Sequence, residues 1–244
     1  MANGDYGYFG KGDTGYAQYM TAFNRNFGGS SGGGGGGGNG DVTISGNAKI
    51  ENAQGGFTGS GIGGGNGASG TVTIKDDSTV TATGGEAGTG IGGGYAGLGD
   101  VTIEGNTTVN ATGGVGSAGI GGGVDSVNDA AGNGNKITIK GNESGSPTVK
   151  AVGGGTNKEN QVFIGGAGIG SGAGDAKANI TLEGKVTIVA KGGEGNAAIG
   201  ANGIEQEFTG LDGSITRYDS EGNDTTLPTD PGYPVPADTS SSGG

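Results

Sequence analysis

The unit that decides the fold is clearest in residues 99–123, which read GDVTIEGNTTVNATGGVGSAGIGGG. Its pattern is G-x-V-T-I-x-G-N-x-x-V-x-A-x-G-G, then a short variable piece, then G-I-G-G-G. The unit occurs five times, with first triplets Val42-Thr43-Ile44, Val72-Thr73-Ile74, Val101-Thr102-Ile103, Ile137-Thr138-Ile139 and Ile180-Thr181-Leu182. A unit of this length repeated in tandem indicates a solenoid in which each unit forms one coil.

The spacing of the units varies in a way that a solenoid tolerates. Ile44 to Ile74 is 30 residues and Ile74 to Ile103 is 29, whereas the next two spacings are 36 and 43. The extra residues fall in three insertions, at 125–135, 143–147 and 156–162. Insertions at turns leave stacked strands undisturbed, so we expect three loops to project from the coils.

Each unit contains three apolar points, which together describe a triangular coil. The V-T-I triplet alternates inward and outward with period two. A second strand repeats this alternation, with the inward pairs Val80 and Ala82, Val109 and Ala111, and Ile188 and Ala190. The third point is the isoleucine of G-I-G, at Ile62, Ile91, Ile120, Ile169 and Ile199. We therefore expect an all-β fold, a short glycine-rich parallel β-solenoid of about five coils and roughly 24 Å in length.

Two outward columns should run along the stacked coils. The residue after each triplet gives Ser45, Lys75, Glu104, Lys140 and Glu183, whose charges alternate from the second coil onward. Opposite charges on neighbouring strands attract, so this column supports the proposed register. The column at the following turn reads Asn47, Asp77, Asn106, Asn142 and Lys185. Asn and Asp suit left-handed turns and can form hydrogen-bonded ladders, so we assign this column a structural role.

The G-I-G-G-G segments are interpreted as tight corners rather than as ligand loops. A phosphate-cradling loop needs a helix after it, and no helix-forming pattern follows any of these segments. The tandem G-G-x-G-x-D calcium repeat is also missing from the sequence. Glycine is then required because a Cβ would clash where two backbones approach closely.

Composition excludes several classes of function. The chain has 67 glycines among 244 residues, no Cys, His or Trp, and a formal net charge of −12. The negative charge disfavours nucleic acid as a partner. No apolar stretch is long enough for a membrane span, and the first 29 residues do not resemble a secretory signal. We expect no metal, no cofactor and no enzymatic activity. Without His and Cys the chain lacks the commonest general base, the thiol nucleophile and the usual zinc ligands, so catalysis would have to rest on carboxylates, and acidic residues in turns ordinarily serve solubility.

Residues 1–29 form a separate segment in this interpretation. A helix is predicted from Asp13 or Thr14 to Phe27, with one apolar stripe made by Tyr16, Tyr19, Met20, Phe23 and Phe27. Such a short helix must dock, either on a partner, as an anchor, or on the open end of its own solenoid. Residues 30–40 follow as a polyglycine linker.

The solenoid domain is predicted to cover residues 41–222. Its end, from Phe208 to Tyr218, contains Ile215 and Thr216 in a strand-like setting and should form a degenerate closing coil. Residues 223–244 are rich in Pro, Ser and Gly and are predicted to be a disordered tail.

The V-T-I-x-G-N and A-G-I-G-G-G units resemble the glycine-rich solenoid repeats of surface and adhesin proteins from bacteria and their phages. The order of aromatic helix, polyglycine linker and glycine-rich head is similar in plan to phage fibre and adhesin proteins. That resemblance implies location in a virion, attachment to a virion or fibre protein through the N-terminal helix, and recognition of a host surface glycan or protein. It also allows a homo-oligomer such as a trimer.

The residues expected to contact the host lie in and beside the insertions, and they are Asp125, Asp129, Glu143, Glu159 and Phe163. Two other functions stay open. The chain could be a secreted bacterial surface or carbohydrate-binding module at the cell exterior. An ice-binding solenoid is the third hypothesis, suggested by Thr79 and Thr81, but the neighbouring coils do not repeat that T-x-T pair.

Overall fold

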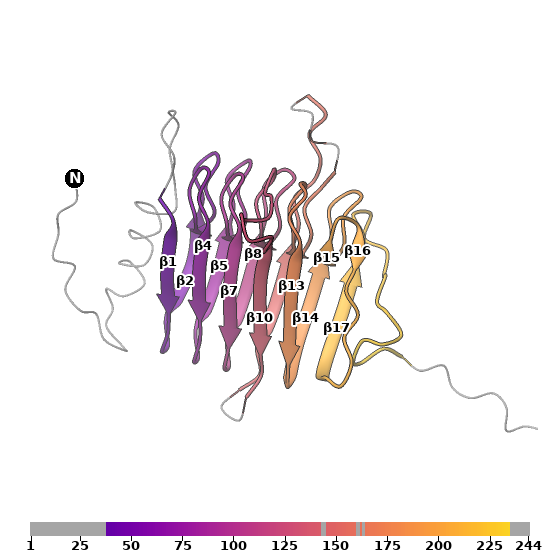
Figure 1. Ribbon diagram of the computed structural model, residues 1–244. Coiled ribbons are helices and arrows are strands. Elements are labelled where there is room, and N and C mark those ends of the chain that lie inside the picture. Colours follow the sequence, from indigo (N-terminus) through magenta and orange to yellow (C-terminus); the bar gives the residue numbers. More distant parts are fainter. Residues whose placement is uncertain (1–37, 143–144, 160–161, 163, 235–244) are drawn as a thin grey trace, which may run out of the picture.

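The computed structural model describes residues 38–142, 145–159, 162 and 164–234 (Figure 1). Within these ranges all regular secondary structure is β, and there is no helix. The predicted helix with Tyr16, Tyr19, Met20, Phe23 and Phe27 lies outside the described residues, as does most of the linker. The strands stack as successive coils along one axis, from β1 to β17 (Figure 1).

The V-T-I triplets form the first sheet, which we call sheet A. Its strand order is β1-β4-β7-β10-β13, and all pairs are parallel. The strands are β1 (Gly40–Ile44), β4 (Gly70–Ile74), β7 (Gly99–Glu104), β10 (Asn135–Lys140) and β13 (Ala178–Glu183).

The second and third segments of each unit form sheets B and C. Sheet B has the order β17-β14-β11-β8-β5-β2, and sheet C has the order β16-β15-β12-β9-β6-β3. The strands of sheet B are β2 (Lys49–Gln54), β5 (Thr79–Thr83), β8 (Thr108–Thr112), β11 (Thr148–Val152), β14 (Lys185–Lys191) and β17 (Asp212–Tyr218). Those of sheet C are β3 (Ile62–Gly63), β6 (Ile91–Gly92), β9 (Ile120–Gly121), β12 (Ile169–Gly170), β15 (Ile199–Ala201) and β16 (Ile204–Glu205).

The register confirms that equivalent residues of successive units lie directly over one another. Ile44 pairs with Ile74, and Ile74 pairs with Ile103. All three side chains are fully buried, as is the isoleucine column of sheet C. The inward residues of the three sheets form one continuous apolar core. A parallel β-solenoid with one strand per sheet in each coil therefore accounts for the repeat.

The glycine corners of sheet C are confirmed as places where a Cβ has no room. At Gly121, φ is +130°, and a Cβ would lie 2.0 Å from the carbonyl oxygen of Gly170 in the next coil. Gly92 has φ +131° and the same relation to Gly121, at 2.2 Å. The coils can stack because their corners carry no side chains.

The two outward columns are borne out in part. In the charged column Lys140 Nζ lies 3.1 Å from Glu183 Oε2, and a parallel column adds Lys136 with Asp100 at 3.6 Å. In the Asn and Asp column, Asn106 Nδ2 donates to Asp77 Oδ1 at 3.3 Å.

The left-handed residue of these turns, however, is one position earlier than expected. Gly46, Asp76, Gly105 and Gly184 have positive φ, whereas Asp77 and Asn106 do not. Asp76 fits because its carboxylate accepts a hydrogen bond from the Gly46 amide of the preceding coil at 2.8 Å. Glycine is the residue that a left-handed turn position favours most, and Asp is one of the few others that adopt it.

The closing coil predicted around Ile215 is confirmed. Strand β17 pairs in parallel with β14, and Ile215 is buried over Ile188. In sheet C the last pair differs, because β16 runs antiparallel to β15. The stack thus ends by a reversal of the chain rather than by another full coil.

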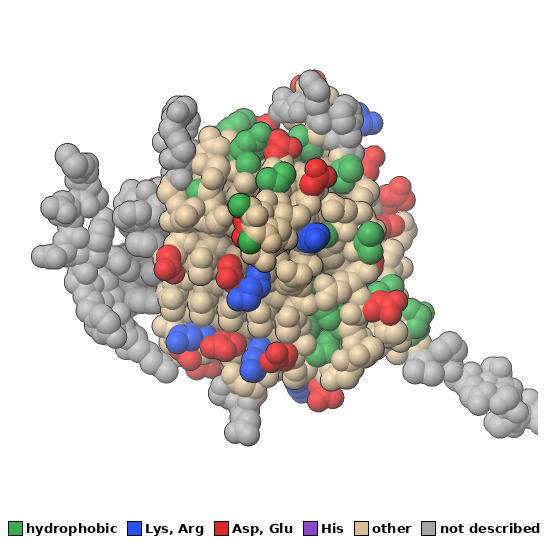
Figure 2. Space-filling view, in the orientation of Figure 1, with side chains coloured by type: hydrophobic (Ala, Val, Ile, Leu, Met, Phe, Trp, Pro, Cys, Tyr) green, Lys and Arg blue, Asp and Glu red, His purple; other side chains and the backbone are tan. Residues whose placement is uncertain are grey.

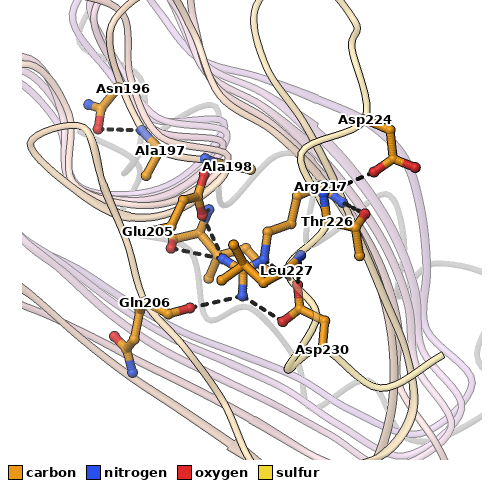
Figure 3. Close-up of polar contacts among 11 residues, drawn as sticks. Asn196, Ala197, Ala198, Glu205, Gln206, Arg217, Asp224, Thr226, Leu227 and Asp230 are labelled. Atoms are coloured by element: carbon orange, nitrogen blue, oxygen red, sulfur yellow. Dashed lines mark hydrogen bonds and ion pairs between the residues drawn. The ribbon is translucent and has the colours of Figure 1, made fainter. Parts of the chain in front are cut away.

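Glu205 completes the end of sheet C by replacing the missing coil (Figure 3). In an earlier coil, Gly168 N and Ile169 N donate to the carbonyls of Ala197 and Ala198. In the last coil, the corresponding amides of Ala198 and Ile199 donate to the two carboxylate oxygens of Glu205, at 2.5 and 3.0 Å. One side chain therefore takes over the hydrogen bonds of two backbone carbonyls.

Arg217 is buried in the core beside Glu205 and forms ion pairs with the carboxylates at the C-terminal end of the solenoid. It pairs with Ala190, so it occupies the position that is an inward alanine in the preceding coils, and its side chain is fully buried. Its guanidinium contacts Glu205 Oε2 at 2.5 Å and both oxygens of Asp230, at 2.6 and 2.8 Å. Burial acts to lower the pKa of Arg217, but hydrogen bonds and charge from Asp230 and Glu205 outweigh it and raise the pKa, so the side chain stays charged.

Residues 223–234 pack against the last coil, although the sequence predicts disorder from residue 223 onward. Asp230 is buried, Ile215 N donates to Pro231 O at 3.0 Å, and Thr225 N donates to Arg217 O at 2.9 Å. The physical reason is Arg217, whose buried charge requires an anion that only this segment and Glu205 supply. Residues 235–244 lie outside the described part of the chain.

Two adjacent glycines give a matched test of the close stacking. A Cβ at Gly154 would lie 1.6 Å from the carbonyl oxygen of Gly114, whereas a Cβ at Gly155 meets nothing within 4 Å. We expect Gly154→Ala to lower the free energy of unfolding by about 1–3 kcal/mol, because the backbone must shift. Gly155→Ala should stay within about 0.5 kcal/mol of the parent in urea denaturation. Equal effects of the two substitutions would contradict this packing.

The end cap is tested by removing its cation. Arg217→Ala leaves Glu205 and Asp230 without their common partner and should cost about 3–5 kcal/mol in the free energy of unfolding. The amides of Ala198 and Ile199 should also exchange faster with deuterium. Lys140→Ala, which removes an exposed ion pair, is the control and should cost at most about 1 kcal/mol. Similar losses in the two variants would show that Arg217 does not close the stack.

Candidate functional site

The loops that enter and leave sheet C gather at one edge of the solenoid, which we call the loop edge. It comprises the loops from sheet B to sheet C and those from sheet C to sheet A. In Figure 1 these loops lie together at the top, while the turns from sheet A to sheet B lie at the bottom. Figure 2 shows hydrophobic and acidic side chains gathered on the loop edge.

A groove of about 280 Å³ opens on the loop edge over the first coils. The loops from sheet B to sheet C contribute Phe57, Thr58, Glu86, Ala87, Val115 and Val162. Those from sheet C to sheet A contribute Asn66, Tyr95, Val124 and Asp125. The walls thus come from residues far apart in sequence, which coil stacking brings together.

Backbone hydrogen bonds hold the two walls in place. Tyr95 N donates to Thr58 O at 2.8 Å, which joins the two kinds of loop across neighbouring coils. Within each wall, Ala87 N donates to Phe57 O at 2.9 Å and Ala96 N donates to Val124 O at 2.8 Å. The groove is therefore part of the hydrogen-bonded stack and is preformed.

Tyr95 and Asp125 form the polar contact of the groove. Tyr95 Oη donates to Asp125 Oδ2 at 2.7 Å. Asp125 occupies a left-handed conformation, with φ +60°, at the start of its insertion. The hydrogen bond to Asp125 is the largest cause of a raised pKa of the Tyr95 phenol, followed by burial and by the carboxylate charge. The phenol therefore stays protonated and keeps Asp125 oriented.

The floor of the groove is apolar. Val124 is buried, and a Cβ at Gly116 would lie 2.7 Å from Val162 Cγ1 and 2.8 Å from Val124 Cγ2. Gly116 thus lets the two valines close the floor. At the rim, Phe57 is 59% exposed, which is unusual for a phenylalanine. The groove combines an apolar base with an aromatic and acidic rim.

The structure brings only part of the predicted contact set together. Asp125 lines the groove, whereas Asp129 and Glu159 do not. Asp129 closes its own loop instead, since its carboxylate accepts hydrogen bonds from the side chain and backbone of Asn133, which lower its pKa. Glu159 is exposed in a turn, where its amide donates to Asn157 Oδ1 at 3.1 Å.

Glu143 and Phe163 lie outside the described residues. Sequence reasoning missed Phe57 and Glu86 as site residues, because each lies in a short turn that carries no insertion. Both residues directly follow a G-G pair, Gly55-Gly56 and Gly84-Gly85, at the same position of successive units. That shared position was a signal that could have placed them on the same edge as Tyr95 and Asp125.

No family model, curated protein or solved structure matches the chain. Across the described ranges, no three acidic side chains come close enough to hold a metal ion. The same part of the chain contains no helix with the length and apolarity needed to cross a membrane. The candidate site therefore depends on the groove geometry alone.

The Tyr95 to Asp125 contact gives a titration test. Asp125→Asn should lower the pKa of the Tyr95 phenol toward its ordinary value, because a neutral amide no longer opposes the phenolate. The pKa can be followed by NMR of ¹³C-labelled tyrosine. Asp129→Asn, outside the groove, is the control and should leave the Tyr95 titration unchanged. If the Tyr95 titration curve of the Asp125→Asn variant equals that of the parent, the hydrogen bond between Tyr95 and Asp125 is contradicted.

Proposed function

We propose that the chain is a non-enzymatic attachment protein, a fibre or receptor-binding component of a phage virion. Residues 1–29 anchor it to the particle, and the loop edge contacts the host surface. The observation that supports the proposal most is the preformed groove, whose lining contains two aromatic side chains, the exposed Phe57 and the half-buried Tyr95. Exposed apolar side chains around a concave surface are typical of interaction sites.

The rigidity of the solenoid supports the same proposal. The first five coils are joined by backbone hydrogen bonds in all three sheets around one apolar core, and Glu205, Arg217 and Asp230 cap sheet C at the C-terminal end. Such a structure holds its surface loops in fixed positions relative to one another without needing a large core. The insertions at 125–135 and 156–162 lie on the loop edge and enlarge the surface that faces a partner, whereas the insertion at 143–147 lies in a turn from sheet A to sheet B, at the opposite edge.

A secreted bacterial surface or carbohydrate-binding module is the second candidate. The groove supports this function as strongly as it supports the phage attachment function, because an aromatic side chain beside a carboxylate is suited to binding a sugar. The two candidates differ in the role of residues 1–29, which the second does not need for attachment to a particle.

The ice-binding hypothesis finds less support in the register of sheet B. Thr81 lies beside Asn110, and Asn110 lies beside Lys150. Sheet A does carry a row of stacked threonines, Thr43, Thr73, Thr102, Thr138 and Thr181. Charged residues such as Asp100, Lys136 and Glu104 flank that row, so it is not a flat uncharged array.

Deletion of residues 1–29 tests the anchoring role. We expect the shortened chain to keep the β circular dichroism spectrum and thermal transition of the parent, but to be lost from purified particles. Incorporation can be measured by immunoblot of the particles, with Asp129→Asn in the full chain as the control. A shortened chain that is incorporated at the parent level would disprove the anchor.

A further inference from the structure

We propose that the groove binds an ammonium group carried on an apolar body, such as a choline-type or amino-sugar group of a surface polymer. This inference rests on the proposed function, since it names the chemistry that the loop edge recognises. It follows from the charge, the aromatic side chains and the size of the groove, each of which narrows the class of ligand.

The charge of the groove selects against anions. Its lining contains two carboxylates, Glu86 and Asp125, and no Lys or Arg. Asp125 accepts a hydrogen bond from the neutral Tyr95 phenol, so this contact brings no positive charge to the groove. A low-dielectric floor made by Val124 and Val162 strengthens the field of these carboxylates at the groove. An anionic group such as a phosphate or a sialic acid carboxylate would be repelled.

The aromatic side chains select for a cation with carbon around it. Phe57 and Tyr95 lie on opposite walls, joined through the hydrogen bond from Tyr95 N to Thr58 O. The faces of aromatic rings attract cations, and this attraction is largest when water is displaced from between them. A methylated ammonium, or an amine on a sugar ring, satisfies the rings and the carboxylates together. A neutral sugar uses only the rings.

The size of the groove limits the ligand to a head group or a single ring. Its volume of about 280 Å³ is at the lower end of small-molecule sites, which usually measure about 300–1,000 Å³. The open rim at Phe57, which is 59% exposed, leaves room for the polymer that carries the group. Affinity for one free group should be weak, and attachment to a surface would use many copies.

The experiment compares charged and uncharged forms of the same shape. The full chain, ¹⁵N-labelled, is titrated with choline and with 3,3-dimethylbutan-1-ol, its uncharged isostere, and separately with glucosamine and with glucose. We expect shifts at the amides of Phe57, Glu86 and Tyr95 with the cations, and at least about tenfold weaker binding of the neutral partners. The choline and glucosamine arms show which source of ammonium the groove prefers. Equal affinity for a cation and its neutral partner, or binding of neither cation, would overturn the proposal.

Variants separate the two sources of attraction. Phe57→Ala should weaken cation binding about five- to tenfold through the lost ring, and Glu86→Gln should weaken it through the lost charge while leaving the neutral ligands unaffected. Glu104→Gln, an acidic residue on the outer face of sheet A, is the charge control and should change nothing. If Glu104→Gln weakens binding as much as Glu86→Gln, the effect is one of net charge and the groove is not the site.

Failure of ammonium binding and failure of the attachment function give different experimental results. A chain that binds no ammonium ligand but still attaches particles to cells refutes this inference and leaves the attachment role standing. Ammonium binding that persists in a chain never incorporated into particles leaves the groove assigned and refutes the virion role.

Discussion

Hydrogen bonds between the backbones of successive coils are the interaction on which the rest of the structure depends. They run through three sheets that are parallel except at the last pair of sheet C, and the residues of the repeated strands lie over their equivalents in the next unit apart from a register shift between β2 and β5. This stacking needs bare backbone at the corners, where the carbonyl of one coil faces the α-carbon of the next at distances that exclude a Cβ. The high glycine content therefore stabilises the fold by permitting contact, although glycine disfavours order in most other settings.

Stacking also creates a problem at each end, because the last coil has amide and carbonyl groups with no following coil. At the C-terminal end of sheet C, a side chain satisfies these backbone groups. Glu205 supplies two oxygens in place of two carbonyls, and the guanidinium of Arg217 forms ion pairs with both Glu205 and Asp230. The Ala198 and Ile199 amides are then no longer available to another strand, so the cap both satisfies the last coil of sheet C and blocks strand addition at these amides.

The candidate groove is a further consequence of the same stacking. A single short turn could not form a binding site. The stacked coils hold several such turns side by side, and their side chains form the walls of one concave surface. Phe57, Glu86 and Val115 come from successive units, as do Asn66, Tyr95 and Asp125. A solenoid can in this way build a site from single residues of each repeat and vary it without changing its core.

Much of the fold could be predicted from the sequence: the coil, its three apolar points, the register and the closing coil. These features follow from the repeated pattern within each unit, because equivalent residues of successive units become neighbours when the coils stack. The sequence did not indicate which turn residue is left-handed, that Arg217 replaces an inward alanine, or that residues 223–234 fold. Those features depend on partners distant along the chain. Only the tertiary structure decided that Asp125 joins Phe57, Glu86 and Tyr95 while Asp129 turns inward on its own loop, since a local hydrogen bond and a contact across coils compete for each side chain.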